Sequence, residues 1–216
     1  MKQRCVVPEL LDHLPPGDPA ARRSRADLRR INFLMGNERW VLRAMRGFPA
    51  AVARGITEVG AGDGALVVKT ARAFPSCRIT AHDLAPCPAM PPDVSAHVAW
   101  RSGDVFHDPP APGGVLVANL FLHHFEGAEL RMLGSLCADH EVLVFNEPDR
   151  SRLALALGHA MFPIVNHVTR HDMIVSIRGG FARGEMQAML GLDDGSWKWR
   201  ETSTWRGARR VLAWRA

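Results

Sequence analysis

Lysine is scarce in this 216-residue chain: three lysines stand against 24 arginines, and the formal net charge is +5. An excess of positive charge is nonspecific and does not by itself identify a polyanion partner, so we do not expect nucleic acid to bind. The four cysteines include no Cys-x-x-Cys pair and no spacing typical of a disulfide framework. Reduced thiols in a cytoplasm are the simplest interpretation.

Long apolar runs are also missing. The N-terminus lacks the apolar core of a signal peptide. The most apolar helix-like stretch, residues 153–166, is shorter than a bilayer span and contains His159. Low-complexity segments and repeats are absent as well, while 47% of the residues are hydrophobic. We therefore expect a folded, cytoplasmic protein without a membrane span; its oligomeric state stays open.

Short apolar runs alternate with helical patterns along most of the chain. The predicted strands are residues 55–59, 77–83, 97–100, 113–119 and 141–146. Five strand–helix alternations predict an α/β fold with a Rossmann-like, doubly wound parallel sheet. The tail, residues 196–215, alternates around Gly207 and predicts an antiparallel hairpin that closes the sheet.

Other local signals concern the segments around this sheet. The first 23 residues hold four prolines and are predicted as an arm, and a capping-box-like Ser24 predicts a helix start. Gly36 is expected to split the helical pattern, and Pro49 to end its second half. Asp149 is expected to cap a later helix. Residues 167–180 are interpreted as part of a long polar insertion, followed by a short helix at 183–190.

A glycine-rich turn follows the first predicted strand. It reads Glu58-Val59-Gly60-Ala61-Gly62-Asp63-Gly64, and its glycines permit a sharp turn that a ligand can approach closely. The same glycines also satisfy a dinucleotide fingerprint, with Asp83 placed 19 residues past Gly64 where a ribose-binding acid is expected. The turn alone therefore leaves a nicotinamide-dependent oxidoreductase open.

Three further features separate the two possibilities. The carboxylate of Glu58, beside the turn, would attract a ligand that carries an ammonium group. It would repel a pyrophosphate. Gly103-Asp104 follows the third strand, and the run from Asn119 to Phe125, which contains a His-His pair, follows the fourth. In these motifs residues 50–148 resemble class I S-adenosylmethionine-dependent methyltransferases. The fourth motif is similar to that of ubiquinone/menaquinone-type small-molecule enzymes.

The resemblance implies S-adenosylmethionine as cofactor and a methyltransferase domain at residues 51–216, preceded by an arm and helical cap at 1–50. Asp83 would bind the ribose hydroxyls. The proline-rich loop after Asp83 replaces a family helix, so the adenine wall departs from the pattern. The implied cofactor-binding residues are Glu58, Gly60, Ala61, Gly62, Gly64, Asp83, Leu84, Asp104, Val105, Asn119 and Leu120.

Catalysis in this class depends largely on alignment of the acceptor, the methyl carbon and the leaving sulfur. An oxygen acceptor also benefits from a base that works near neutral pH. His124 and His171 are the predicted catalytic residues, and His123 and Arg178 the predicted substrate-binding ones. The structural alternatives are that His124 shapes its loop and that His171 and Arg178 tie down the insertion.

No metal is expected, because His167 and His171 have helical spacing but no His-Glu-x-x-His motif or cysteine cluster accompanies them. We expect methylation of a small aromatic or lipophilic acceptor by direct displacement, at oxygen in preference to carbon. The alternatives are a nicotinamide-dependent oxidoreductase, a nucleic-acid methyltransferase and a noncatalytic nucleoside-binding member. The run from Asn119 to Leu122 lacks the Pro-Pro-aromatic signature of base-methylating enzymes.

Overall fold

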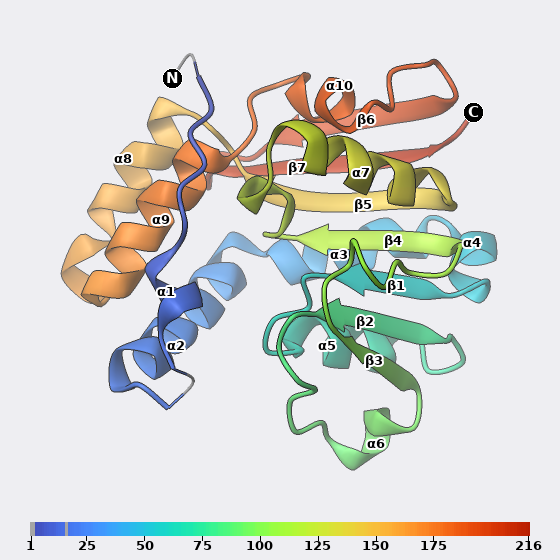
Figure 1. Cartoon of the computed structure of the whole chain (residues 1–216), viewed down its shortest axis with the longest axis horizontal. Helices are drawn as coiled ribbons and strands as arrows, with labels where there is room; N and C mark the ends of the chain where they lie inside the picture. The colour runs from blue at the N-terminus through green and yellow to red at the C-terminus, as the bar shows by residue number, and fades with distance from the viewer. Residues whose placement is uncertain (1–2, 16) are drawn as a thin grey trace.

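A computed structural model describes residues 3–15 and 17–216 of the chain. At its centre is a seven-stranded sheet in the order β3-β2-β1-β4-β5-β7-β6 (Figure 1). β1 to β5 are parallel, while β7 is antiparallel to both β5 and β6, as predicted. The strands are Ile56–Val59 (β1), Ile79–Asp83 (β2), Val98–Ser102 (β3), Gly113–Asn119 (β4), His140–Pro148 (β5), Trp197–Ser203 (β6) and Ala208–Arg215 (β7).

Helices surround this sheet on both faces and beyond one edge. The α-helices are Leu10–His13 (α1), Pro19–Met35 (α2), Asn37–Arg46 (α3), Pro49–Ala53 (α4), Ala65–Ala73 (α5), Pro92–Ser95 (α6), Gly127–Ala138 (α7), Arg152–Ala160 (α8), His167–Gly179 (α9) and Glu185–Leu190 (α10). Two 3-10 turns complete the set, Leu122–His124 (η1) and Phe162–Ile164 (η2). None of the helices in the described part of the chain is long and apolar enough to cross a membrane.

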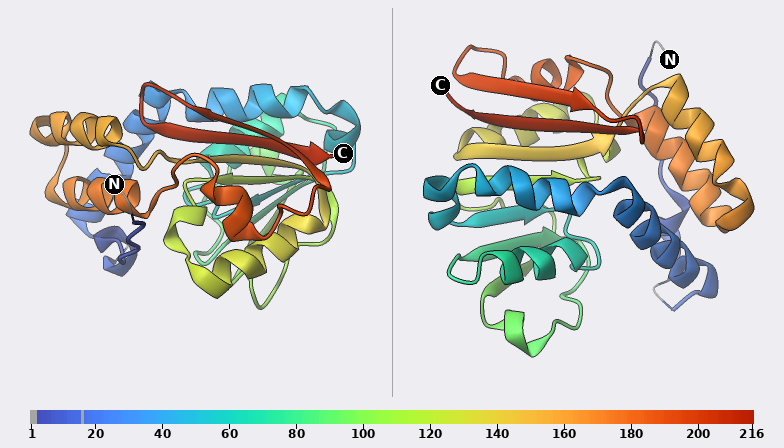
Figure 2. Two further views of the ribbon diagram at one scale, coloured as in Figure 1. Left: turned by 90° about the horizontal axis from the view of Figure 1, so that it is seen from above. Right: turned by 180° about the vertical axis from the view of Figure 1, so that it is seen from behind.

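The sheet lies between two helical layers, with α7 and α10 on one face and α3, α4 and α5 on the other (Figure 2). Each layer packs on its own apolar cluster, and the strands supply both. Glycine permits the closest approaches. A Cβ at Gly134 would lie 1.7 Å from the carbonyl oxygen of Leu190, and one at Gly114 would lie 1.6 Å from that of Ala51. These two contacts hold α10 on α7 and α4 on β4.

A helical cap, made of α1, α2, α8 and α9, lies beyond the carboxyl ends of β1, β2 and β4 (Figure 1). Buried polar bonds join α2 to the start of α9. The backbone amide of Asn166 donates to Asp27 Oδ2 at 3.0 Å, and Thr169 Oγ1 lies 3.0 Å from Ser24 Oγ. Because buried polar groups need partners, these bonds fix the register of the two helices. The cap therefore covers the edge at which parallel strands present their site residues.

The structure corrects the predicted start of α2. The helix begins at Pro19, because Asp18 Oδ1 accepts hydrogen bonds from the amides of Ala20 (2.6 Å) and Ala21 (3.2 Å) and Pro19 suits the first helical position. Ser24, the predicted cap, lies inside the helix and is buried. The prolines of the N-terminal segment thus mark a helix start as well as an arm.

Two further local predictions are wrong, those for Pro49 and Asp149. Pro49 opens α4 at its first turn and does not end α3, which stops at Gly47. Asp149 pairs with Arg209, and α8 is capped by Ser151, whose Oγ accepts a bond from the Ala154 amide. The insertion at 167–180 is a helix, α9. By contrast, the proline-rich stretch after β2 has no helix apart from the four-residue α6, as predicted.

Candidate functional site

The glycine turn lies between β1 and α5 and presents an open face. Gly60, Gly62 and Gly64 have φ values of +68°, +57° and +74°, a region that other residues enter only with strain. A Cβ at Gly60 would lie 2.1 Å from Cδ2 of Phe121, so the phenyl ring packs directly on this glycine. A Cβ at Gly62 would meet nothing within 4 Å. The space beside Gly62 is therefore free to receive a ligand.

Glu58, near the end of β1, is 4% exposed and has no hydrogen-bond partner among the described residues. Burial raises the pKa of Glu58 well above its ordinary value, and the nearby carboxylates of Glu38, Asp83 and Asp63 raise it further. Four acidic groups thus surround the turn without an equal set of cations. A positively charged ligand such as a sulfonium that also carries an ammonium group fits this surplus.

Asp83 stands at the carboxyl end of β2 and connects two turns. Its Oδ2 accepts a hydrogen bond from the Gly62 amide at 2.7 Å, and its Oδ1 accepts one from the Ala85 amide at 2.8 Å. A carboxylate offers further lone pairs, so these bonds orient it and leave it able to accept from hydroxyls. Leu84, the next residue, is 78% exposed beside it.

Asp63, inside the glycine turn, bonds to two neighbouring elements. Its Oδ2 lies 2.9 Å from Nη1 of Arg29 on α2, and its Oδ1 accepts a bond from the Ala65 amide at the start of α5. The acid therefore caps the first turn of α5, where the helix dipole also favours it. It joins the glycine turn to the helical cap.

Asp104 and Val105 follow β3. Asp104 Oδ1 accepts a hydrogen bond from the Phe106 amide at 2.9 Å, and its Oδ2 lies 3.0 Å from His107 Nδ1. The backbone bond, together with the hydrogen bond and charge of His107, holds the pKa of Asp104 below its ordinary value. Val105 is buried beside it. The loop is thereby fixed next to the end of β2.

Asn119 and Leu120 end β4 in a strained turn. Leu120 has a φ of +58°, which is unusual for a side chain of its size, and its amide donates to the Asn146 carbonyl at 2.8 Å. Asn119 Oδ1 accepts a bond from Asn146 Nδ2 at 2.9 Å. Such strain persists where the surrounding structure enforces it, commonly at functional sites.

Glu147, which sequence reasoning missed, organises the histidine turn η1. Its Oε1 accepts bonds from the amides of Phe121 (3.0 Å) and Leu122 (2.9 Å), while its Oε2 lies 2.8 Å from His123 Nδ1. The side chain is fully buried. An acid at the end of a central apolar strand was the available signal, since a charge there needs a specific partner.

The two histidines of η1 have different protonation behaviour, and their ring centroids lie 4.2 Å apart. Burial opposes protonation of His123, but its hydrogen bond to Glu147, its contact with Glu9 and the charges of both acids raise its pKa to about 9. Burial, and then the positive charge of His123, lowers the pKa of His124 to about 4. At neutral pH the pair therefore carries one positive charge, on His123, and the neutral ring of His124 keeps a free lone pair.

Glu9, also missed from the sequence, reaches this pair from the N-terminal arm. Its Oε1 lies 3.5 Å from His123 Nε2, and its carboxylate accepts a hydrogen bond from Ser176 Oγ on α9. Burial would raise the pKa of Glu9, but the hydrogen bond and charge of His123 keep it below the ordinary value. No local pattern marks Glu9, because its partners come from distant parts of the chain.

Two groups fasten the arm around Glu9. Asp172 accepts hydrogen bonds from the amides of Leu10 (2.7 Å) and Leu11 (3.0 Å). Arg4 stacks on the ring of Phe181, 4.4 Å from its centroid. The Arg4 guanidinium also donates to the carbonyl oxygens of Leu122, His123, Phe125 and Gly179. The arm is thus tied to both η1 and α9.

The structure places His171 and Arg178 on α9, and the side chains of both are exposed. His171 Nδ1 lies 2.9 Å from Oδ1 of Asp172, the acid that holds the arm. Among the described residues, no bond joins His171 or Arg178 to the histidines of η1. The roles assigned to them from the sequence stay predictions.

A family model described as an O-methyltransferase domain matches residues 27–140, more than half of the chain. The chain belongs to this family. Membership confirms the predicted S-adenosylmethionine-dependent methyltransferase and its methyl donor, and it removes the nicotinamide-dependent alternative. A comparison by sequence with curated proteins gives no match.

Solved structures share the fold of this methyltransferase at low identity. The plantazolicin methyltransferase BpumL, in complex with a monoazolic desmethylPZN analog and SAH, is 9% identical with a TM-score of 0.67, over 92% of this chain and 91% of that one. Human N-acetylserotonin methyltransferase, in complex with SAM, is 17% identical with a TM-score of 0.58, over 95% and 61%. Magnesium protoporphyrin IX methyltransferase from Synechocystis PCC 6803, with bound SAH, is 13% identical with a TM-score of 0.57, over 88% and 93%.

Proposed function

We propose that this methyltransferase transfers a methyl group to an oxygen of a small acceptor bound between the carboxyl edge of the sheet and the helical cap. The observation that carries the proposal is the contact between the two halves of the site. Phe121, directly before the histidine turn, packs on Gly60 of the glycine turn. A donor lying on the glycine turn therefore has the histidines of η1 as neighbours.

Donor binding is assigned to the strand ends. S-adenosylmethionine supplies an activated methyl group on a sulfonium, and its positive charges would offset the buried carboxylate of Glu58. Asp83 would accept from the ribose hydroxyls, since its orientation is already fixed by two backbone amides. Asp104 and Val105 would hold the adenine, and the turn at Asn119 and Leu120 would lie beside the amino-acid part.

Activation of the acceptor is assigned to η1. His124, with its free lone pair, would accept a hydrogen bond from the acceptor hydroxyl, and the positive charge of His123 would stabilise negative charge developing on that oxygen. The oxygen then attacks the methyl carbon as the carbon–sulfur bond breaks, and the hydroxyl proton passes to His124 or to water. Alignment of these atoms supplies most of the catalysis.

The acceptor class follows from the aromatic side chains at this turn. Phe121 and Phe106 both pack edge-on against Phe125, with ring centroids 4.9 Å and 5.5 Å apart. Such rings favour an aromatic or lipophilic acceptor. Two similar proteins are named as methyltransferases of N-acetylserotonin and of magnesium protoporphyrin IX, and these names support a small-molecule acceptor.

The test is methyl transfer from labelled S-adenosylmethionine to a panel of phenols and enolic ring compounds, with NMR of each product. We expect an O-methyl product from at least one phenol. His124→Gln should reduce the turnover number about 100-fold or more. The control variant His97→Gln should leave the turnover number unchanged, because His97 is exposed and lies outside the proposed active site. A C-methyl product would show that the acceptor atom is carbon and would contradict the proposed methylation at oxygen. Donor binding without turnover on any acceptor would indicate a noncatalytic member.

A further inference from the structure

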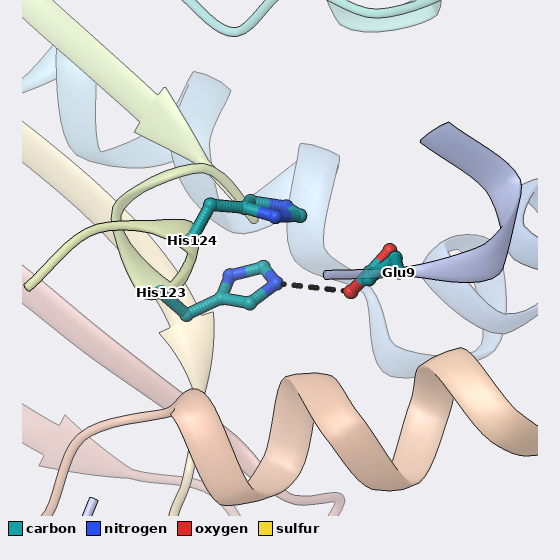
Figure 3. Close-up of side chains that lie close together, drawn as sticks. All are labelled: Glu9, His123 and His124. Carbon is teal, nitrogen blue, oxygen red and sulfur yellow. Dashed lines mark ion pairs between the residues drawn. The ribbon is translucent and has the colours of Figure 1, made fainter. Parts of the chain in front are cut away.

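Glu9, His123 and His124 present three potential metal ligands to one another. One ligand atom from each side chain lies within 4.8 Å of the other two (Figure 3). Glu9 comes from the arm and the histidines from η1, so the set joins two segments that are distant in sequence. Glu9 and His123 are buried and His124 is half-buried. Two imidazoles and a carboxylate form a common ligand set for divalent first-row transition metals.

The orientation of His123 is an independent observation. Its Nδ1 is fixed on Glu147 at 2.8 Å, which directs Nε2 toward Glu9 and His124 (Figure 3). The residue is 4% exposed, and Nε2 is buried without a hydrogen-bond partner among the described residues. Glu9 Oε1, at 3.5 Å, lies beyond the usual range of an N–H···O bond. Nε2 thus has an acid 3.5 Å away but no hydrogen bond of normal length, which leaves this buried nitrogen able to bind a further partner.

The surroundings of the three ligands are those of a metal site. A metal-binding histidine typically places its second ring nitrogen on a carboxylate, as His123 does on Glu147, and this fixes which nitrogen faces the metal. Glu9 is likewise held, by Ser176 Oγ. Arg4 and Asp172 fasten the arm that carries Glu9, so the third ligand does not depend on a mobile segment.

The local charge also favours a cation. Three carboxylates, those of Glu9, Glu147 and Asp172, lie around the histidine pair. The cations among these groups are Arg4, which bonds to the backbone of η1, and His123 itself, whose Nε2 proton the ion would replace. A divalent ion at the vertex of the three ligands would balance this surplus without displacing any of the bonds that hold η1 in place.

We infer that Glu9, His123 and His124 bind a divalent transition-metal ion of the zinc type. Three protein ligands leave a coordination position open, as catalytic zinc sites do. What the ion would do rests on the proposed function: placed beside the donor site, it would act as a Lewis acid and lower the pKa of the acceptor hydroxyl. With the ion bound, His123 and His124 hold the metal, and the ion takes over the activation of the acceptor that the two imidazoles supply in its absence.

The first experiment measures binding of Zn²⁺ and Co²⁺ to the full chain after chelator treatment, by competition titration and visible absorption. We expect one ion per chain. The Co²⁺ spectrum should lack thiolate charge-transfer bands, because the ligand set contains no cysteine and the exposed Cys5 and Cys87 lie outside it. Strong thiolate bands, or no saturable binding of either ion, would overturn the inference.

Matched variants locate the site. Glu9→Gln retains the hydrogen bond to Ser176, and His124→Gln leaves the His123–Glu147 pair intact. Each should weaken Zn²⁺ binding about 10-fold or more and remove the rise in melting temperature that Zn²⁺ gives the unaltered protein. His97→Gln should bind Zn²⁺ normally. Unchanged affinity in folded Glu9→Gln and His124→Gln would contradict the site.

The outcome is separable from that of the proposed function. Donor binding, followed calorimetrically with S-adenosylhomocysteine, and methyl transfer are measured with and without Zn²⁺. Methyl transfer to a phenol without any metal binding would defeat the metal inference alone. Metal binding that depends on Glu9, together with exclusive methylation at carbon, would defeat the oxygen assignment and keep the metal site.

Discussion

The two halves of the proposed site, the donor half around the glycine turn and the acceptor half around η1, are built in different ways. The donor half comes from one turn and the ends of neighbouring strands, and its key carboxylate, Glu58, has no hydrogen-bond partner within the described chain. The acceptor half comes from the arm, η1, β5 and α9, and its key carboxylate, Glu147, accepts bonds from three backbone amides and contacts the His123 ring. The first half is thus incomplete until a cationic ligand arrives, whereas most of the second is already satisfied.

Among the variants considered, we expect Glu147→Gln to cause the largest loss of activity. Glu147→Gln preserves shape but removes the charge beside His123, so the turnover number should fall about 100-fold or more. Donor affinity should change by less than about 3-fold, because the amide oxygen of the new Gln can still accept the bonds from Phe121 and Leu122 that hold η1 in place. Steady-state kinetics and calorimetry with S-adenosylhomocysteine measure both quantities.

The matched control for this change is Glu141→Gln on the same strand, which removes only a surface ion pair with Arg54. A surface pair is worth about 1 kcal/mol at most, so activity should be retained. If donor affinity falls in parallel with turnover in Glu147→Gln, the two halves are not separable.

Two neighbouring glycines distinguish packing from ligand space. Gly60→Ala should destabilise the protein by about 2–3 kcal/mol, because the new Cβ overlaps Phe121 and φ is positive. Gly62→Ala adds only the strain, about 1 kcal/mol, but its Cβ enters open space where the donor should lie. Thermal unfolding and donor calorimetry should therefore rank the two variants in opposite order. If Gly62→Ala binds the donor as tightly as the unaltered protein does, the donor does not bind beside Gly62.

The same contrast explains what the sequence could predict. Residues of the donor half occur in local motifs, so the glycine turn, Asp83 and the parallel sheet could be predicted from pattern and spacing. Glu9 is separated from its partner Ser176 by 167 positions, and no periodicity connects them. The start of α2 was mispredicted for a related reason: Ser24 matches a cap locally, but tertiary packing uses it to bind Thr169. Local sequence patterns predict helices, strands and turns. The arrangement of the acceptor half depends on hydrogen bonds between residues that are distant in sequence, and local patterns do not predict these.

A smaller effect is expected at Glu58, with opposite signs for stability and binding. Glu58→Gln removes a buried carboxylate that lacks a partner, so the ligand-free protein should become more stable by about 1 kcal/mol, raising the melting temperature by roughly 2–4 °C. Affinity for S-adenosylmethionine should fall about 10-fold, since a charge-assisted interaction is lost. Loss of both stability and affinity would show that Glu58 already has a structural partner.

The smallest effect is a pH dependence of donor binding. The folded-state pKa of Glu58 is raised, so the free protein retains a proton there as the pH climbs above the ordinary value of 4.5. A cationic donor favours the carboxylate, so binding releases this proton and affinity rises with pH across that window, then levels off. The same sign applies to folding: the free protein loses stability through this window, and the gain from Glu58→Gln should vanish near pH 4.5.

Neighbouring charges set the controls for this measurement. The groups around Glu58 are Glu38, Asp63 and Asp83, with Lys69 paired to Glu38 and Arg29 paired to Asp63. Any of these carboxylates would also favour a cation, so the slope is assigned to Glu58 only by its loss in Glu58→Gln. S-adenosylhomocysteine, which lacks the sulfonium charge, should give a shallower slope than S-adenosylmethionine. Equal slopes for the two ligands, retained in Glu58→Gln, would show that the proton released on binding comes from another group and that Glu58 does not set the charge of the donor half.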